Sequence, residues 1–258
     1  MSGHSKWSTI KRQKGVADIK RGQTFTKLAL AITIAAKTGG SGDPDSNPRL
    51  RAALESASAV NLPKENIQRA IDRGLGKLPG QMIEEVNFEG FGPGKTAFFV
   101  EAVTDNKMRT LSEIKNMFER SGGHLGGQGS TAHLFDKKGE IKIFGKGGGV
   151  EEELLELIDL GAEDVEDLME DDGILPTGRQ VQKYLIYVEP KALSIMSNNI
   201  VQSGFKVEQL GVVMQPNLTV EIQDKELALK VVQFAQKLED HDDVQLVYAN
   251  FNLPEELI

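Results

Sequence analysis

The sequence predicts an α+β fold in which a helical bundle at the N-terminus precedes two small α+β domains, each a sheet covered by helices. First, the chain of 258 residues has the length of two or three domains of about 100 residues each. Second, residues 1–78 show the apolar spacing of helices, whereas strand and helix patterns alternate after Pro79. Third, these alternating stretches are too short for one large sheet, which favours two small domains.

The first 78 residues are predicted to form three helices behind a basic leader. Phe25, Leu28 and Ile32 recur on one helix face, and Gly39 ends that pattern. A loop rich in Gly, Asp and Ser follows, and two further amphipathic segments come after it. The start signals of these two helices are Asn47 as N-cap before Pro48, and Pro63 for the last helix, which Gly74 closes.

Strand patterns and helix patterns share the remainder of the chain. The predicted strands cover 97–103, 141–144, 184–188, 205–214, 218–222 and 244–251, and the predicted helices cover 109–121, 191–203 and 227–238. The glycine-rich segments 122–129 and 145–149 are expected to form no regular element, and 133–135 is strand-like. Residues 150–172 hold 12 acids and no basic residue, which we interpret as a helix with an acidic outer face.

The charge is distributed unevenly along the chain. Residues 1–78 hold 14 Lys and Arg against 6 Asp and Glu, a net +8, whereas the remaining 180 residues hold 16 against 32, a net −16. Seven of the basic residues fall within the first 27, beside the only tryptophan, Trp7. Basic side chains interleaved with an aromatic suit phosphate contacts and base stacking. This end of the chain is therefore predicted to bind nucleic acid, against the alternative of a solvated charged tail.

Motifs for catalysis, cofactors and metals are absent or incomplete. Cysteine is absent, which excludes disulfides and thiolate metal sites. Gly94-Lys95-Thr96 resembles the end of a phosphate-binding loop, but it lacks the required earlier glycine and the helix that should follow. The string 127–132 has the form G-x-G-x-x-A without the strand and helix that a dinucleotide fold needs. We expect no enzyme and no cofactor.

Histidines and carboxylates also lack a catalytic or metal-ligating pattern. No pair among His4, His124, His133 and His241 has the spacing of a metalloprotease helix, so no metal is expected. The carboxylates of 151–172 form one continuous face rather than a pair in different environments. The longest apolar run, 28–36, is too short to cross a membrane, and we expect a cytoplasmic protein.

Several strings, taken together and in this order, resemble the YebC family of bacteria and organelles. They are GHSKW at 3–7, ADIKRGQTFTKL at 17–28, the segment 43–74, FEGFGPG at 88–94 and GSTAHLF at 129–135. The resemblance is strong up to residue 135 and continues in pattern to the C-terminus. It implies three domains, the third inserted in the second: residues 1–78, residues 79–130 with 216–258, and residues 131–215.

The resemblance also implies a function, with two alternatives. Bacterial members are described as probable transcriptional regulators that bind DNA. Other members, similar to the mitochondrial translational activator of cytochrome oxidase subunit I, act in translation, and ribosome-bound members relieve stalls at consecutive prolines. From the residues, the basic leader favours folded RNA, while the helix 64–73 keeps a DNA reading open. A protein-interaction adaptor that uses the acidic helix is the third class, and no membrane or small-molecule partner is expected.

The sequence departs from the family pattern around the GPG turn. Phe88 and Phe91 stand where the family commonly has tyrosines, Lys95 replaces a common glycine, and His124 stands where asparagine is common. Lys95 adds a positive charge at a loop tip that could strengthen a phosphate contact. The predicted nucleic-acid contacts are therefore His4, Lys6, Trp7, Lys11, Arg12, Lys14, Lys20, Arg21, Lys27, Arg49, Arg51, Arg69, Arg73 and Lys95.

Overall fold

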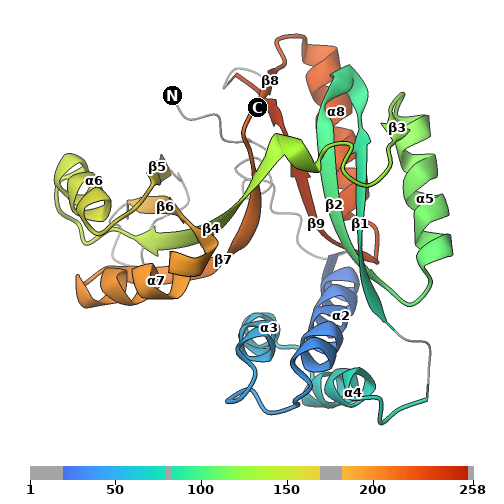
Figure 1. Ribbon diagram of the computed structural model, residues 1–258, viewed down its shortest axis with the longest axis horizontal. Coiled ribbons are helices and arrows are strands. Elements are labelled where there is room, and N and C mark those ends of the chain that lie inside the picture. The colour runs from blue at the N-terminus through green and yellow to red at the C-terminus, as the bar shows by residue number, and fades with distance from the viewer. Residues whose placement is uncertain (1–19, 80–82, 169–181, 255–258) are drawn as a thin grey trace. The chain divides into compact units, whose positions relative to one another are not determined.

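The computed structural model describes residues 20–79, 83–168 and 182–254 (Figure 1). The chain divides into two compact units. Unit 1 combines the segment that ends at Phe135 with the segment that begins at Pro216, and unit 2 is the segment Asp136–Gln215 between them. No helix in the described ranges is both long and apolar enough to span a membrane.

Three helices form the first part of unit 1: α2 (Lys20–Gly39), α3 (Pro48–Ala59) and α4 (Lys64–Gly74). Their shared core includes Ile32, Leu50 and Ile71. The predicted N-cap of α3 is confirmed, because the Asn47 side chain accepts a hydrogen bond from the Leu50 N–H over 3.1 Å. The Asn47 amide also donates to the Ala35 carbonyl over 2.9 Å, which ties the start of α3 to α2.

The sheet of unit 1 has four strands in the order β3-β1-β2-β9. They are β1 (Glu84–Phe91), β2 (Ala97–Thr104), β3 (His124–Leu125) and β9 (Val244–Ala249), and the three adjacent pairs are antiparallel. A second sheet is a short parallel pair, β8 (Val220–Glu221) with β10 (Phe251–Asn252), which packs against the same core.

Two helices pack on one face of this sheet, α5 (Lys107–Arg120) and α8 (Lys225–Glu239). Three phenylalanines form the centre of that core: Phe98 from β2, Phe118 from α5 and Phe234 from α8. The Phe234 ring meets each of the other two rings edge-on, with ring centroids 4.9 Å apart. The contacts between these rings fix α5 and α8 against the sheet and against each other.

Helix α2 joins the helical part to the sheet. Leu30 and Ile34 of α2 pack with Ile83 and Val103, in a small cluster separate from the main core. The Lys37 ammonium, also on α2, donates a hydrogen bond to the Ile83 carbonyl over 2.6 Å. The helical part of unit 1 is therefore held to the sheet by both apolar and polar contacts.

Unit 2 has its own sheet, in the order β5-β6-β4-β7. Its core joins the strands to two helices through Ile141, Tyr184, Ile186, Leu157 and Ile200, all fully buried. The elements are β4 (Phe135–Phe144), α6 (Val150–Asp159), β5 (Asp164–Leu168), β6 (Lys183–Val188), α7 (Leu193–Gln202) and β7 (Lys206–Pro216). The α+β fold class is thus confirmed. The three-domain division with its boundaries near 78, 130 and 215 stays a prediction.

The predicted acidic helix of 150–172 is wrong in its second half. Helix α6 ends at Asp159, and Gly161 adopts a left-handed φ of 104°. The Gly161 N–H then bonds the Ile158 carbonyl and the Ala162 N–H bonds the Leu157 carbonyl, which closes the helix. Strand β5 follows, and residues 169–172 lie outside the described residues. The run of acids concealed the change from helix to strand, because exposed charged side chains show neither the helical nor the strand periodicity of buried apolar residues.

Two further expectations about local structure are also wrong. The glycine-rich segment 122–129 contains a short strand, β3, which pairs with the end of β1. The strand-like segment 133–135 begins instead as a 3₁₀ turn, Ala132–Leu134, before β4 starts at Phe135. On β1, position 90 requires a glycine. Gly90 lies against β3, and an added Cβ would come within 2.6 Å of the His124 carbonyl oxygen.

Candidate functional site

The predicted nucleic-acid contacts fall into three groups. His4, Lys6, Trp7, Lys11, Arg12 and Lys14 lie outside the described residues. The backbone of Lys20 and Arg21 forms the first turn of α2. The structure places the side chains of the remaining six: Lys27, Arg49, Arg51, Arg69, Arg73 and Lys95.

Two of these six side chains bond to the sheet part of unit 1. The Lys27 ammonium donates to the Glu239 carbonyl at the end of α8. The Arg49 guanidinium forms an ion pair with the Glu85 carboxylate of β1, and both side chains are half-exposed. Exposed pairs of this kind contribute at most about 1 kcal/mol, so Arg49 can exchange Glu85 for a phosphate at low cost. Lys27 is more firmly committed to the fold, because its partner is a helix-end carbonyl.

Two more of the predicted contacts have partners nearby. Arg51 donates to the carbonyls of Pro44 and Asp45 over 3.2 and 3.1 Å, which braces the loop before α3. The Arg73 guanidinium lies 3.8 Å from the Asp105 carboxylate, at the outer limit of an ion pair. The basic residues of the bundle are therefore largely used to hold unit 1 together, which their sequence pattern did not indicate.

Arg69 and Lys95 remain open to solvent. Arg69 is exposed on α4, and it has no ion-pair partner among the described residues. Lys95 is exposed at the tip of the turn between β1 and β2, with a left-handed φ of 59°. That backbone conformation disfavours residues with a side chain and is most easily adopted by glycine. Arg69 and Lys95 lie on different elements, α4 and the turn between β1 and β2, so each is a separate candidate.

Unit 1 contains a groove of about 1260 Å³. Helix α5 lines it through Arg109, Glu113, Met117 and Arg120, and helix α8 lines it through Lys230, Gln233, Phe234 and Lys237. Side chains of α2, Arg73 of α4 and the loop 240–243 line the end of the groove where α5 begins and α8 ends. The groove was not predicted from the sequence. The only signal was the spacing of Lys230, Gln233 and Lys237, which places them on one helix face.

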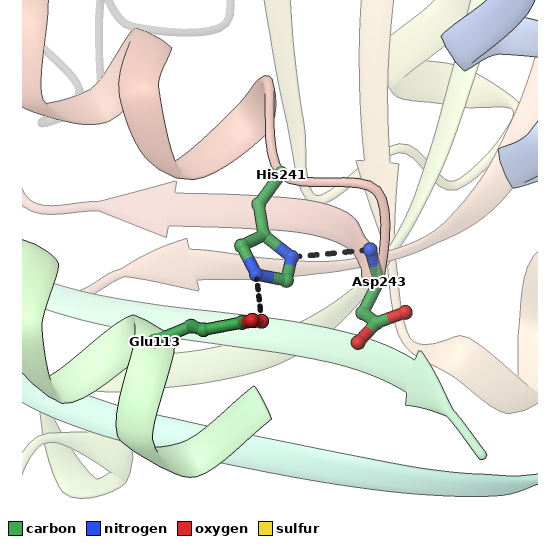
Figure 2. A group of neighbouring side chains, drawn as sticks. All are labelled: Glu113, His241 and Asp243. Carbon is green, nitrogen blue, oxygen red and sulfur yellow. Dashed lines mark hydrogen bonds and ion pairs between the residues drawn. The ribbon is translucent and has the colours of Figure 1, made fainter. Parts of the chain in front are cut away.

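Glu113, His241 and Asp243, which all line the groove, form a hydrogen-bonded cluster (Figure 2). His241 donates from Nε2 to the Glu113 carboxylate over 2.9 Å, and its Nδ1 accepts from the Asp243 backbone N–H over 3.1 Å. Because Nδ1 faces an N–H donor, it carries the lone pair, which assigns the ring proton to Nε2. Both nitrogens of His241 are thus used within the protein.

The same cluster holds a buried carboxylate. Asp243 accepts hydrogen bonds from Arg109 and Thr110, each over 2.7 Å, and from Thr104 over 3.2 Å. Burial raises the pKa of Asp243, but the bonds from Thr110 and Arg109 outweigh burial, so its pKa lies below the ordinary value. This carboxylate therefore stays ionised and fixes the start of α5 to the strand β9.

Glu113, His241 and Asp243 offer metal-ligand atoms within 4.8 Å of one another, but their hydrogen bonds do not suit a metal ion. A metal at Nε2 of His241 would need the ring proton on Nδ1, where it would collide with the Asp243 N–H. The Asp243 oxygen is already satisfied by three donors, one of them the cation Arg109. These residues fit an internal network and not a metal centre.

The backbone of the glycine-rich string 127–132 binds an anion of the protein itself, the carboxylate of Glu89. The Glu89 carboxylate on β1 accepts the backbone N–H groups of Gly129 and Thr131 over 2.8 Å each, and that of Ala132 over 2.7 Å. Burial raises the pKa of Glu89, but these backbone hydrogen bonds lower it by more, so its pKa lies below the ordinary value. The loop has the chemistry of a phosphate nest with Glu89 in the anion position.

Replacing Glu89 by glutamine is expected to destabilise unit 1 by about 1–3 kcal/mol at neutral pH, since the glutamine NH₂ would face backbone donors. A carboxylate with a lowered pKa stabilises the fold above its ordinary pKa and loses that effect as pH falls through the lowered value. The difference in the free energy of unfolding between Glu89→Gln and the wild type should therefore become smaller in acid. Hydrogen exchange of β1 and β2 measures this difference. Glu84→Gln, exposed on the same strand, is the control. A gap that is constant with pH would contradict this assignment.

Helix α6 keeps the adaptor hypothesis open as a prediction. Leu155 and Ile158 lie 63% and 54% exposed, beside the acids Glu151, Glu152 and Asp159. The buried acid of this helix, Glu153, instead accepts the N–H groups of Lys146 and Gly148 over 2.9 Å each and shapes the glycine-rich loop before α6. The acidic face is therefore narrower than the sequence indicated.

Comparison with known proteins covers both parts of the chain. A family model described as the TACO1/YebC protein N-terminal domain matches residues 5–77, and one described as the TACO1/YebC second and third domain matches residues 83–251. A protein of Dictyoglomus thermophilum is 44% identical over 259 residues, which cover 100% of this chain and 98% of that protein. A protein of Moorella thermoacetica is 46% identical over 255 residues, covering 98% and 96%.

Both relatives carry the name "probable transcriptional regulatory protein". Among solved structures, the crystal structure of a conserved hypothetical protein from Aquifex aeolicus matches with a TM-score of 0.83 and 40% identity. That match covers 98% of this chain and 99% of the other. The sequence similarity and the structural similarity both extend over the full length.

Proposed function

The chain belongs to the TACO1/YebC family, and on that premise we propose that it is a non-enzymatic regulator of gene expression that acts by binding nucleic acid. Relatives at 44% identity are named probable transcriptional regulatory proteins, which makes DNA the first candidate target and the cytoplasm the place of action. The proposed contacts are the basic residues of 1–27 together with Arg69 and Lys95. Four of the predicted contacts, Lys27, Arg49, Arg51 and Arg73, would need to leave their present partners.

The charge asymmetry is the observation that carries this proposal. Residues 1–78 have a net charge of +8, in a chain whose net charge is −8. Phosphate contacts from Lys and Arg supply most of the affinity of such proteins. Because the described basic side chains of the bundle are mostly bonded within unit 1, the leader has to supply most contacts. The acidic remainder would restrict binding to that end of the molecule.

The non-enzymatic part of the proposal draws support from the groove. Glu113 and His241 are placed like an acid and a base, but both ring nitrogens of His241 are already hydrogen-bonded, one to Glu113 and the other to the Asp243 backbone. The serine that lines the groove, Ser121, donates its hydroxyl to the Phe118 carbonyl over 2.7 Å. A nucleophile next to an available base, the usual requirement for covalent catalysis, is not formed by these described residues.

A second candidate is an RNA-binding factor that acts on the ribosome, and helix α4 favours it. A DNA-reading helix presents a run of Arg, Asn or Gln to base edges. Helix α4 exposes Gln68 and Arg69, but the acid Glu65 lies on the same helix surface and Ile71 is buried in the bundle core. Such a face suits contacts with a nucleic-acid backbone better than base reading in a major groove.

Ultraviolet crosslinking in living cells, followed by sequencing of the attached nucleic acid, tests the proposal. Crosslinks concentrated on a few promoters would establish the transcriptional regulator. Crosslinks concentrated on ribosomal or transfer RNA would establish the translation factor and reject the DNA target. The control is the same chain with Lys6, Lys11, Arg12 and Lys14 replaced by glutamine, which should lose the signal. A wild-type chain that crosslinks to neither DNA nor RNA above background would overturn the proposed function.

A further inference from the structure

We propose that the groove between α5 and α8 is a second nucleic-acid site, one that takes a short single-stranded segment. This inference rests on the proposed function and adds to it a contact surface in the acidic part of the chain. The site consists of three cations along the groove, Arg120, Lys230 and Lys237, with Gln233 between the two lysines. None of these residues was among the contacts predicted from the sequence.

Two contacts fix how the walls of the groove are aligned. Phe118 meets Phe234 with ring centroids 4.9 Å apart, and Glu113 meets His241 just beyond the end of α8 over 2.9 Å. Moving from residue 113 to 118 along α5 therefore corresponds to moving from residue 241 back to 234, so the helices are antiparallel. Arg120 then lies level with the Lys230 end of α8, away from the loop 240–243.

The charges of the groove are consequently separated along its length. Five acids line the groove, and all lie at the end formed by the start of α5 and the loop 240–243: Asp105, Glu113, Asp240, Asp242 and Asp243. Arg109 pairs with Asp105, Glu113 and Asp243. Asp242, also at that end, is the lining acid without a partner among the described residues. The remaining cations have no such compensation, because Arg120, Lys230 and Lys237 are exposed and have no ion-pair partner in the described ranges. Lys237 lies within one helical turn of Asp240, whereas Arg120 and Lys230 lie at the other end of the groove, so an anion is attracted most strongly to the end with Arg120 and Lys230.

The dimensions and lining favour a single strand over other anions. A volume of about 1260 Å³ exceeds that of a small-molecule pocket, about 300–1000 Å³, and suits an extended ligand. Half-buried Met117 offers an apolar floor for a base, and the exposed Gln233 amide can both donate to and accept from a base edge. Phosphates would lie against the three cations.

The test compares two full-length variants with equal loss of charge. The groove variant carries Arg120→Gln, Lys230→Gln and Lys237→Gln, and the matched control carries Lys107→Gln, Lys137→Gln and Lys191→Gln, three exposed lysines outside the groove. The probe is a fluorescent oligouridylate, titrated at several salt concentrations. Losing three contacts should weaken binding by about 100-fold at 0.1 M salt and reduce the salt slope by about 2. The control variant should bind as the wild type does.

Each outcome separates this site from the proposed function. If the wild type binds and the groove variant matches the control, the groove site is wrong and the function stands. If the wild type binds neither the oligouridylate nor any other strand, both are wrong. Crosslinking of a 4-thiouridine probe to the full chain adds a direct readout. We expect the probe to attach to α5 and α8, and attachment only to other parts of the chain would overturn the site. Displacement of the probe by free uridine monophosphate would also overturn a strand site, in favour of a nucleotide site.

Discussion

Replacing Lys6, Lys11, Arg12 and Lys14 together by glutamine is expected to lower affinity for duplex DNA by roughly a thousandfold at 0.1 M salt. Each phosphate contact contributes about 0.9 to the slope of log affinity against log salt on duplex DNA, and about 0.7 on a single strand. Four lost contacts thus reduce the slope by about 3.6 or by about 2.8, according to the target. Fluorescence anisotropy titrations over a range of salt concentrations measure both quantities.

The control for this experiment removes the same number of positive charges from the acidic part of the chain. Lys107, Lys137, Lys191 and Lys225 are exposed, and replacing them by glutamine gives the same net charge as the leader variant. If net charge alone determined binding, the two variants would lose equal affinity. If the leader supplies the contacts, the control variant keeps its affinity and its salt slope. Wild-type affinity in the leader variant would contradict the proposed role of residues 1–27.

Features that depend on residues close together in the sequence were predictable. Asn47 and Pro48 stand directly before α3, and their preference for a helix start has a local physical cause, a side-chain oxygen that accepts a backbone N–H. The apolar spacing in α5, α7 and α8 likewise indicates which face of each helix is buried. The glycine pair at the end of α2 marks a helix stop because it accepts a left-handed backbone.

The partners of the basic residues were not predictable, because they lie far away in the sequence. Lys27 bonds to a carbonyl 212 positions later, and Arg49 pairs with Glu85, 36 positions later. A composition count registers these cations as available, although the fold uses them to join the bundle to the sheet. The same limit applies to Glu89, which fills a loop 40 positions away that resembles a nucleotide-binding motif.

The groove cations show the opposite limit. Lys230 and Lys237 belong to an acidic region, so a charge average over residues 79–258 conceals them. Their significance depends on Arg120 on another helix and on the pairing of the neighbouring acids with Arg109. Only the packing of α5 against α8 brings these groups to one groove and leaves them without compensating charge.

Replacing Asp243 by alanine is expected to destabilise unit 1 by about 2–4 kcal/mol at neutral pH, the largest single effect on stability that we expect in the site. Asp243 is 8% exposed and accepts from Thr104, Thr110 and Arg109, so its loss removes from the buried network the one carboxylate that these three donors share. Its backbone carbonyl also bonds the Val103 N–H over 2.8 Å. Hydrogen exchange at Val103 therefore reports the change within unit 1, independently of unit 2.

The pH dependence identifies the charge as the cause. The pKa of Asp243 is lowered in the folded protein, so its ionised form stabilises the fold above its ordinary pKa, and that contribution fades as pH falls through the lowered value. The gap between the wild type and Asp243→Ala should thus shrink in acid, whereas Asp243→Asn should lie between them at neutral pH because it keeps one acceptor. Asp242→Ala, which removes a neighbouring exposed acid, should leave exchange at Val103 unchanged. An equal effect from Asp242→Ala would assign the loss to net charge and reject the network as the element that joins α5 to the sheet.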